Sequence, residues 1–246
     1  MQQIFPEPMD NVDVQSIYQS DVRAPLGDRP WVMCNMISSA DGGIAVDGTS
    51  GGLGGAGDKT VFSALRSIPD VIMVASGTVI AENYGPPESP ESIQSEREQR
   101  GQERQPRLAI VTRSLNIDPE HPVFGSSASP LVITTTNSDE AARGELGKVA
   151  DIIMAGEDDV DLQGALSQLG ADGTKIVLLE GGPTLNGAFV DADLVDELFL
   201  SFAPYLLGGE SPRIVKRSAI GALRDLQLQR IMHEDGTLFH RYTRNR

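Results

Sequence analysis

Residues 174–203 read TKIVLLEGGPTLNGAFVDADLVDELFLSFA, and this stretch decides the fold class. The apolar run at 174–180 predicts a buried strand, and a second apolar run at 196–202 predicts another. Between them, Pro183 stands near the start of a helix predicted over 181–192, where its missing N–H costs nothing. A strand, a helix and a strand in succession indicate a crossover between parallel strands of an α/β sheet.

The same alternation continues through most of the chain. Further strands are expected at 31–38, 70–76, 107–112, 131–136, 150–156, 224–234 and 237–243. Helices are expected at 11–19, 59–68, 78–84, 138–150 and 160–170. We therefore predict an α/β fold with a mostly parallel central sheet and antiparallel strands at the C-terminal end.

Loop composition sets the expected domain limits. Residues 1–28 are polar and are predicted to form an N-terminal arm, followed by one domain over 29–246. Residues 39–58 are rich in glycine and are predicted to be loop. Residues 86–106 have almost no apolar side chains, so we expect them to bury little surface and to form a flexible insertion.

Charge and cysteine content exclude several function classes. The 246 residues include 35 acidic and 20 basic side chains, and the resulting net charge of −15 disfavours nucleic acid and anionic membranes as partners. Cys34 is the one cysteine and there are three histidines, so we expect neither a disulfide nor a metal site. The N-terminal residues lack the apolar core of a signal peptide, which predicts a cytoplasmic protein.

Two glycine turns that follow predicted strands are candidate anion sites. Gly181 and Gly182 let the backbone pass close to a ligand, and the helix that follows offers unpaired N–H groups. Gly77 and Thr78 form a similar turn after the strand at 70–76. Either turn alone is equally explained as a plain connection, and Thr78 as a helix cap. Two such turns in one sheet favour a bound dinucleotide.

Other residues at predicted strand ends suggest what this ligand is. Thr112, Arg113 and Ser114 follow the strand at 107–112, and hydroxyls flanking an arginine suit the 2′-phosphate of NADP, although a solvated loop arginine explains the pattern as well. Glu180 ends a core strand, where open α/β sheets bind ligands and where an acid needs a partner. The near-match to a nucleoside-triphosphate loop at 52–60 is rejected because Asp58 interrupts it.

Four segments together resemble a known family, the pyrimidine reductases of riboflavin biosynthesis, or RibD C-terminal-domain family. They are RPWVMCNMISSADGGIA (29–45), DVIMVASGTVIAENYGPP (70–87), the connecting strand RLAIVT (107–112) and LLEGGPTLNGAFVDADLVDELFLSFAPYLLGG (178–209). The resemblance spans residues 29–243, and its E-G-G to L-V-D-E-L block is specific. It implies a dihydrofolate-reductase-like, three-layer α/β/α fold.

The resemblance also implies an activity and a site. It implies NADPH-dependent reduction of 5-amino-6-(5-phosphoribosylamino)uracil, a phosphorylated pyrimidine, with hydride transfer to C1′ of the sugar. Glu180 and Asn35 are the implied catalytic residues, and Ser50, Arg66 and Glu180 the substrate contacts, with Arg66 on the 5′-phosphate. The expected cofactor contacts are Ser38, Thr78, Glu82, Thr112, Arg113, Gly181, Gly182, Pro183, Thr184 and Leu185.

Departures from the family pattern keep two other functions open. Asn35 stands where bifunctional members often carry Lys, and Gly52 stands where a large residue is usual. These differences allow an NADPH-dependent reductase of another substrate, such as dihydrofolate or a pterin, or a non-catalytic nucleotide-binding protein. Family members are commonly dimers, and the apolar stretch at 194–207 predicts a homodimer through the C-terminal strands. The alternative is that this stretch is a central strand.

Overall fold

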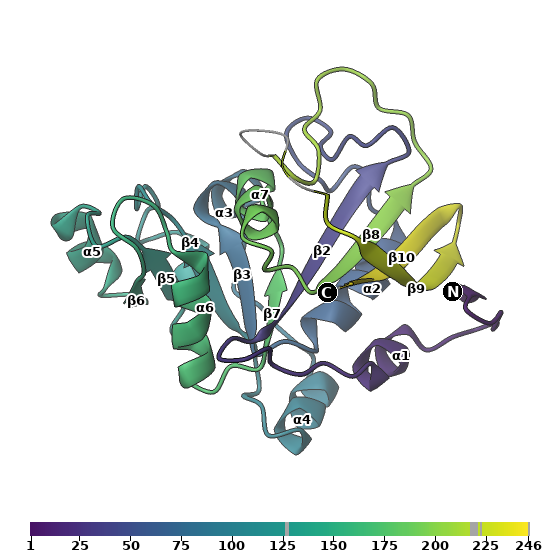
Figure 1. The fold of residues 1–246 in the computed structure, drawn as a ribbon, viewed down its shortest axis with the longest axis horizontal. Coiled ribbons are helices and arrows are strands. Elements are labelled where there is room, and N and C mark those ends of the chain that lie inside the picture. Colours follow the sequence, from purple (N-terminus) through teal and green to yellow (C-terminus); the bar gives the residue numbers. More distant parts are fainter. Residues whose placement is uncertain (126–127, 217–220, 222, 246) are drawn as a thin grey trace. The chain divides into compact units, whose positions relative to one another are not determined.

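The computed structural model describes residues 1–125, 128–216, 221 and 223–245, and these fall into two compact units. Unit 1 comprises residues 1–23, 32–66 and 179–246, and unit 2 comprises residues 24–31 and 67–178 (Figure 1). Each unit combines strands and helices, so the predicted α/β class is confirmed. Among the residues described, no helix is long and apolar enough to cross a membrane.

Unit 2 contains the parallel half of the predicted sheet. Its strands follow the order β7-β3-β4-β5-β6, and β3 pairs with β4, β4 with β5 and β5 with β6 in parallel register. The bounds are β3 Val71–Ala75, β4 Arg107–Val111, β5 Leu131–Thr134, β6 Asp151–Met154 and β7 Ile176–Leu179. Each lies within a segment predicted to be a strand, because a strand buried on both faces is a nearly continuous apolar run.

The helices of unit 2 cover these strands. They are α3 Ser76–Ala81, α4 Glu91–Gln99, α5 Glu140–Leu146 and α6 Leu162–Ala171, with a 3-10 turn at Pro122–Phe124. The carboxylate of Asp161 caps α6 by accepting from the N–H of Gly164 at 3.0 Å. Fully buried side chains on both faces of these strands and on α6 include Ile72, Met73, Ala109, Ile110, Val132, Ile133 and Leu166.

The segment at 86–106 departs from the prediction. It contains α4, and the side chain of Arg97 on this helix is completely buried. The Arg97 guanidinium donates to the carbonyl oxygens of Ser67, Pro69 and Glu103 at 3.1, 2.8 and 2.9 Å. The expectation that this segment buries little is therefore wrong, because an arginine paired with backbone carbonyls replaces an apolar anchor.

Unit 1 contains the antiparallel C-terminal strands. The order is β1-β9-β10-β8-β2, in which β2 and β8 are parallel and the other neighbours antiparallel. The bounds are β1 Gln2–Phe5, β2 Trp31–Ser39, β8 Glu197–Ala203, β9 Leu226–Glu234 and β10 Thr237–Arg244. The helices are α1 Val14–Ser20, α2 Ala56–Arg66 and α7 Pro183–Asp191.

Helices lie on both faces of the unit 1 strands, which gives the predicted three layers. On one face, Tyr18 of α1 makes an edge contact with Phe199 of β8, and Asp58 of α2 accepts a hydrogen bond from Ser201. On the other face, Asn186 of α7 contacts the sulfur of Met36 on β2 at 3.2 Å. Because side chains alternate between faces along a strand, the strands β2 and β8 contribute side chains to the contacts with helices on both faces.

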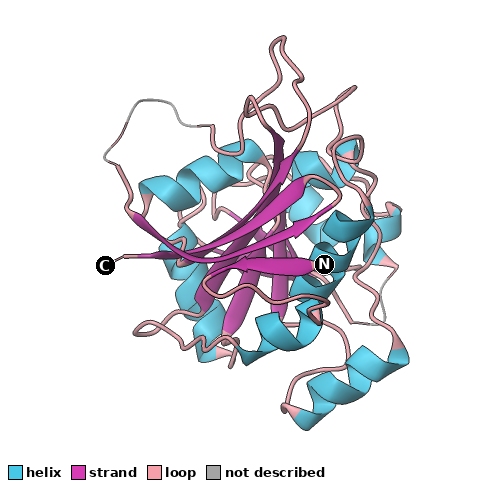
Figure 2. Cartoon of the chain, turned by 90° about the vertical axis from the view of Figure 1, so that its right-hand side faces the viewer, coloured by secondary structure: helices cyan, strands magenta, loops and turns pink. Residues whose placement is uncertain are grey.

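The first 28 residues do not form the separate arm that their polarity predicts. Strand β1 pairs with β9, and Figure 2 shows this N-terminal strand beside the C-terminal ones. Tyr18 is buried, and Arg23 donates to both carboxylate oxygens of Glu197 at 2.6 and 3.0 Å. Residues 1–23 are therefore an integral part of unit 1.

Strand β8 lacks the free edge that the predicted dimer through the C-terminal strands requires. The apolar stretch at 194–207 contains β8, which is hydrogen-bonded to β2 on one side and to β10 on the other. It is a central strand of its sheet and has no free edge for a second subunit. Its side chains alternate between buried and half-buried, and its place between two paired strands is the alternative that the sequence left open.

Candidate active site

The carboxylate predicted to be catalytic forms an ion pair at the end of β7. Glu180 accepts from Nε of Arg66 at 2.8 Å and from Nη2 of the same guanidinium at 2.7 Å. The Glu180 side chain is 2% exposed, whereas that of Arg66 is 24% exposed. Arg66 is the last residue of α2 and lies over the ring of Phe62, with Cζ 4.2 Å from the centroid. A buried carboxylate is thus linked to a cation that reaches solvent.

The two glycines after Glu180 lead directly into α7. Gly181 has a φ of +85°, a conformation that favours glycine, and Gly182 is the N-cap of the helix. No side chain caps this helix, and Pro183 occupies its first turn as predicted. The amides of Thr184 and Leu185 belong to the same turn, where helix N–H groups have no partner within the helix. This turn has the composition of an anion site.

A buried amide lies beneath this turn. Asn186 is 1% exposed, and its side-chain NH2 donates to the carbonyl oxygen of Ile214 at 2.8 Å. Its Oδ1 is buried and has no hydrogen-bond partner within the described protein atoms. A Cβ on Gly181 would lie 3.7 Å from this oxygen. The turn therefore presents an unused acceptor beside its glycines.

Two of the predicted site residues, Asn35 and Ser38, lie on opposite faces of strand β2. Asn35 is in register with Phe199, which packs against α1, whereas Ser38 is in register with Phe202 on the opposite face. Asn35 therefore shares the face covered by α1 and α2, and Ser38 shares the face covered by α7. Ser50 is half-buried in the loop before α2, where its carbonyl oxygen accepts from Leu53.

The remaining predicted cofactor residues belong to unit 2. Thr78 lies in α3 and its carbonyl oxygen accepts from the N–H of Glu82 at 2.9 Å. The Thr112 hydroxyl is buried and accepts from the N–H of Leu115 at 3.0 Å, which gives it a turn-forming role. Arg113 is 69% exposed and pairs with Asp159 at 2.8 Å.

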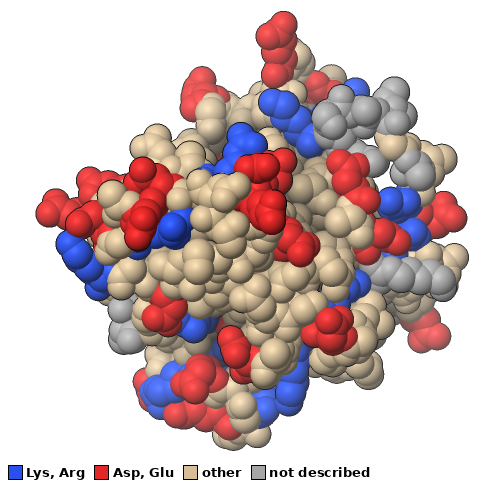
Figure 3. Space-filling model, turned by 60° about the vertical axis from the view of Figure 1, so that its left-hand side comes forward, with Lys and Arg blue, Asp and Glu red and all other residues tan. Residues whose placement is uncertain are grey.

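The described residues of the two units give little support to catalysis by a cysteine nucleophile or by a bound metal ion. Burial raises the pKa of the Cys34 thiol to about 12, so it is a poor nucleophile. Within the described part of the chain, no group of His, Cys, Asp or Glu side chains is arranged to hold a metal ion. On the face shown in Figure 3, Lys and Arg alternate with Asp and Glu and do not gather in one patch.

Comparison with known proteins identifies the family. The family described as the RibD C-terminal domain matches residues 30–235, a range that contains Asn35, the Arg66–Glu180 pair and the glycine turn. The chain belongs to this family. The resemblance drawn from four sequence segments is thereby confirmed.

Individual members of the RibD C-terminal-domain family match most of the chain. A protein of Methanothermobacter thermautotrophicus named 2,5-diamino-6-ribosylamino-4(3H)-pyrimidinone 5′-phosphate reductase is 31% identical over 216 residues, or 82% of this chain and 92% of the relative. A protein of the same name from Archaeoglobus fulgidus is 28% identical over 76% of this chain and 86% of its own length. The crystal structure of a pyrimidine reductase-like protein from Corynebacterium diphtheriae has a TM-score of 0.81 and 30% identity, covering 96% of this chain and all of that one.

Two side-chain contacts near this site were not predicted from the sequence, that of Phe62 with Arg66 and that of Asp41 with the backbone of 207–208. Phe62 supports Arg66 from one helical turn away, and this i, i+4 spacing was readable once 59–68 was predicted to be a helix. Asp41 lies in the segment 29–45 that carries the family resemblance, and the sequence pattern predicts no role for it. In the structure it accepts from the N–H groups of Leu207 and Gly208 at 3.1 and 2.7 Å. No local pattern signals a contact across 166 residues.

Proposed function

We propose that this chain is an NADPH-dependent reductase that converts a phosphoribosylamino-pyrimidine into its ribitylamino form in riboflavin biosynthesis. The observation that carries the proposal is the Arg66–Glu180 pair, immediately before the uncapped glycine turn of α7. It offers a cation for a phosphate and a carboxylate for sugar hydroxyls or ring N–H groups. Family membership and the names of the relatives support the same reaction class.

The residues of unit 1 fit a dinucleotide. The pyrophosphate would be held by the backbone of Gly182, Thr184 and Leu185, where the helix dipole and N–H groups favour an anion. The unpartnered Oδ1 of Asn186 suits an N–H or O–H donor of the ligand. Ser38 lies on the α7 face of β2 and supplies a further hydroxyl.

Thr78, Glu82, Thr112 and Arg113 are proposed as further cofactor contacts from unit 2. Arg113 is the one most suited to a 2′-phosphate, because its present partner, Asp159, is 85% exposed and bound by a surface ion pair. Such pairs are weak, so a phosphate would replace this carboxylate at little cost. This exchange supports a preference for NADPH over NADH.

On the substrate side, we assign the 5′-phosphate to Arg66. The guanidinium is held by Glu180 and by the ring of Phe62, so little side-chain entropy is lost when it binds an anion. Ser50, in the loop before α2, is proposed as a second phosphate or sugar contact. An ionised carboxylate can accept several hydrogen bonds, and we propose Glu180 as an acceptor for substrate hydroxyl or N–H donors.

The reaction adds a hydride to C1′ of the ring-opened imine and a proton to its nitrogen, and a reduced nicotinamide supplies the hydride when it is bound. The protein's part is to orient the sugar. Glu180 would fix its hydroxyls, Arg66 its phosphate, and Asn35 would donate a hydrogen bond from the α2 face of β2. Holding the reacting atoms in contact in this way accounts for much of an enzyme's rate gain.

Two pyrimidines differ by one amino group and are both candidate substrates. The 28% and 31% identical relatives are named for the 2,5-diamino-pyrimidinone, and we favour it on that ground. The resemblance alone pointed to the deaminated uracil. Purified protein should oxidise NADPH with the diamino compound and more slowly with the uracil. Turnover of dihydrofolate alone, or nucleotide binding without turnover, would contradict the proposal. We also propose a cytoplasmic location, because a phosphorylated substrate of this kind does not cross membranes freely.

We also propose a homodimer, through a face of the unit 1 sheet instead of an edge. Half-buried side chains of β8 and β10 make an uncharged surface: Leu198, Leu200, Phe202, Leu238, His240 and Tyr242. Two chains of net charge −15 can meet on such a surface without like charges in contact. Light scattering should give twice 26.3 kDa, and Leu200→Asp should give the monomer mass. A monomeric wild-type protein would refute the dimer.

A further inference from the structure

The segment 205–216, which we call the strap, follows β8 and lies along the loop 39–45 that follows β2 (Figure 1). The N–H of Ala40 donates to the carbonyl oxygen of Tyr205 at 2.9 Å. The Ser211 hydroxyl accepts from the N–H groups of Ile44 and Ala45 at 3.0 and 3.1 Å. The strap and this loop are therefore joined at several points in unit 1.

The close approach explains a glycine in the loop. A Cβ on Gly43 would lie 2.8 Å from Cδ2 of Leu207 and 3.1 Å from Cβ of Ser211. These distances are shorter than ordinary carbon contacts, so a larger residue would push the strap away. The strap thus rests directly on the loop backbone.

Asp41 is the charged side chain that joins the two segments. Its carboxylate accepts from the Ser39 hydroxyl at 2.6 Å and from the N–H groups of Gly208 and Leu207 at 2.7 and 3.1 Å. These hydrogen bonds, that of Ser39 first, lower the pKa of Asp41 to about 2. The carboxylate is therefore ionised at neutral pH, and its hydrogen bonds are charge-assisted.

The far end of the strap contacts the first turn of α7. The N–H of Lys216 donates to the carbonyl oxygen of Pro183 at 2.9 Å. The carbonyl oxygen of Ile214 accepts from the side-chain NH2 of Asn186, which fixes where the other end of that amide points. The strap is therefore hydrogen-bonded to Asp41 near one end and to the first turn of α7 at the other.

We propose that Asp41 is a positioning residue: by holding the strap, it orients Asn186 and the turn at Gly181–Pro183 for the phosphate-bearing ligand. Asp41 itself does not contact the ligand. The inference rests on the proposed function, because that function assigns a dinucleotide to this turn. It adds a specific expectation, that a carboxylate in the loop after β2 controls nucleotide affinity.

The test compares Asp41→Asn with Asp47→Asn. Asp47 lies in the same loop, is exposed, and loses the same charge on substitution. Amide hydrogen exchange is followed at 206–216 and at 183–188, and calorimetry measures the Kd for NADP+. We expect Asp41→Asn to speed exchange in both segments and to raise the Kd roughly tenfold, the size of one charge-assisted hydrogen bond. The KM for nucleotide should rise while kcat changes little. Asp47→Asn should match the wild type.

The outcomes separate this inference from the proposed function. Faster exchange in the strap with unchanged exchange and Kd at α7 would overturn the positioning role. A wild type that binds no NADP+ would overturn the proposed function, and exchange at 183–188 would still show whether Asp41 acts on the turn. If Asp41→Asn folds poorly, Ser211→Ala serves as the second variant. It removes the side chain that accepts from Ile44 and Ala45, and it should produce the same changes to a lesser degree.

Discussion

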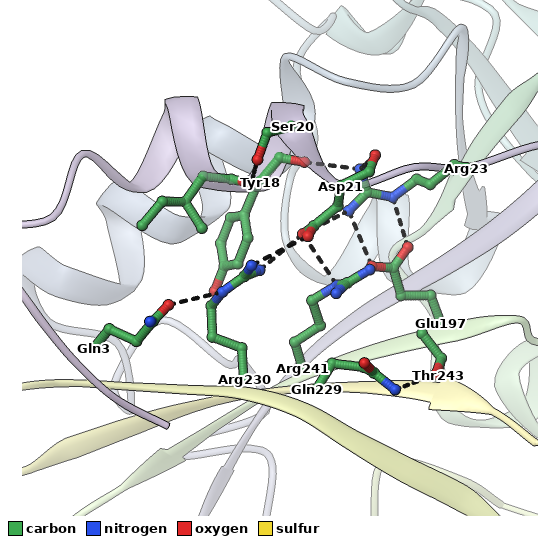
Figure 4. Close-up of polar contacts among 11 residues, drawn as sticks. Gln3, Tyr18, Ser20, Asp21, Arg23, Glu197, Gln229, Arg230, Arg241 and Thr243 are labelled. Atoms are coloured by element: carbon green, nitrogen blue, oxygen red, sulfur yellow. Dashed lines mark hydrogen bonds and ion pairs between the residues drawn. The ribbon is translucent and has the colours of Figure 1, made fainter. Parts of the chain in front are cut away.

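Unit 1 contains two groups of ionic side chains that differ in how completely they are enclosed. Asp21, Arg23, Glu197, Arg230 and Arg241 form one network between the N-terminal segment and the C-terminal strands (Figure 4). Glu197 is 0% exposed and accepts from Arg23 and Arg241. Asp21 forms ion pairs with these two arginines and with Arg230. In the second group, Arg66 and Glu180 pair with each other, and Arg66 is 24% exposed.

The difference separates a structural role from a binding role. In the network, two carboxylates and three guanidiniums bind one another, and the cluster joins residues 3–23 to β8, β9 and β10. Removing one member leaves a buried charge without its partner. The Arg66–Glu180 pair lies beside the glycine turn and reaches solvent. We therefore expect changes in the first group to alter stability and changes in the second to alter catalysis.

The largest effect is expected from Glu197→Ala. It removes the fully buried carboxylate to which Arg23 and Arg241 both donate and leaves the two guanidiniums to share Asp21, which should lower the free energy of unfolding by about 3–5 kcal/mol. Denaturant unfolding measures this change. The folded fraction should retain its kcat. A loss of kcat with normal stability would break the distinction between the two groups.

A second prediction concerns Arg66→Ala. Because this change removes the partner of the buried Glu180 carboxylate, it should lower the free energy of unfolding, but by less than Glu197→Ala, since Arg66 itself reaches solvent. The variant should lose roughly 10²-fold in kcat/KM, because a guanidinium–phosphate contact is charge-assisted and bidentate. A substrate without its 5′-phosphate should lose little more in the variant than in the wild type. If the two losses add in full, Arg66 does not bind the phosphate.

The pH dependence of stability sharpens the comparison further. Burial alone raises the pKa of Glu197, but the ion pairs with Arg23 and Arg241 outweigh burial and hold it below the ordinary value of 4.5. Because the folded-state pKa is lowered, this stability is present above pH 4.5 and is lost as the pH falls below that value. Glu197→Gln should flatten the acid limb of unfolding free energy against pH, and Glu180→Gln is the control. An unchanged acid limb in Glu197→Gln would contradict this account.

The smallest effect is expected from the exposed pair in unit 2. Arg113→Ala removes a surface ion pair with Asp159, so the free energy of unfolding should change by less than about 1 kcal/mol. The KM for NADPH should rise several-fold and the KM for NADH should not change, because only NADPH carries the 2′-phosphate. Equal effects on both would show that Arg113 does not read this phosphate.

How much was predictable depends on the range of the interactions. Buried strands such as 70–76 and 107–112 were predicted because apolar runs are a local signal. The burial of Arg97 was not, because backbone carbonyls from residues far along the chain accept its hydrogen bonds. The Arg66–Glu180 pair joins residues 114 apart, so the sequence identified both side chains but not their contact.

The central claim is that this chain transfers hydride to the sugar carbon of a phosphorylated pyrimidine. The most direct measurement uses NADPH deuterated at the transferring position of the nicotinamide, with the 2,5-diamino-pyrimidinone as substrate, and locates the label by NMR. We predict deuterium at C1′ of a ribitylamino product from the wild type, and no product from Glu180→Gln that is as stable as the wild type. Deuterium at another atom, or none in the product, would contradict the account.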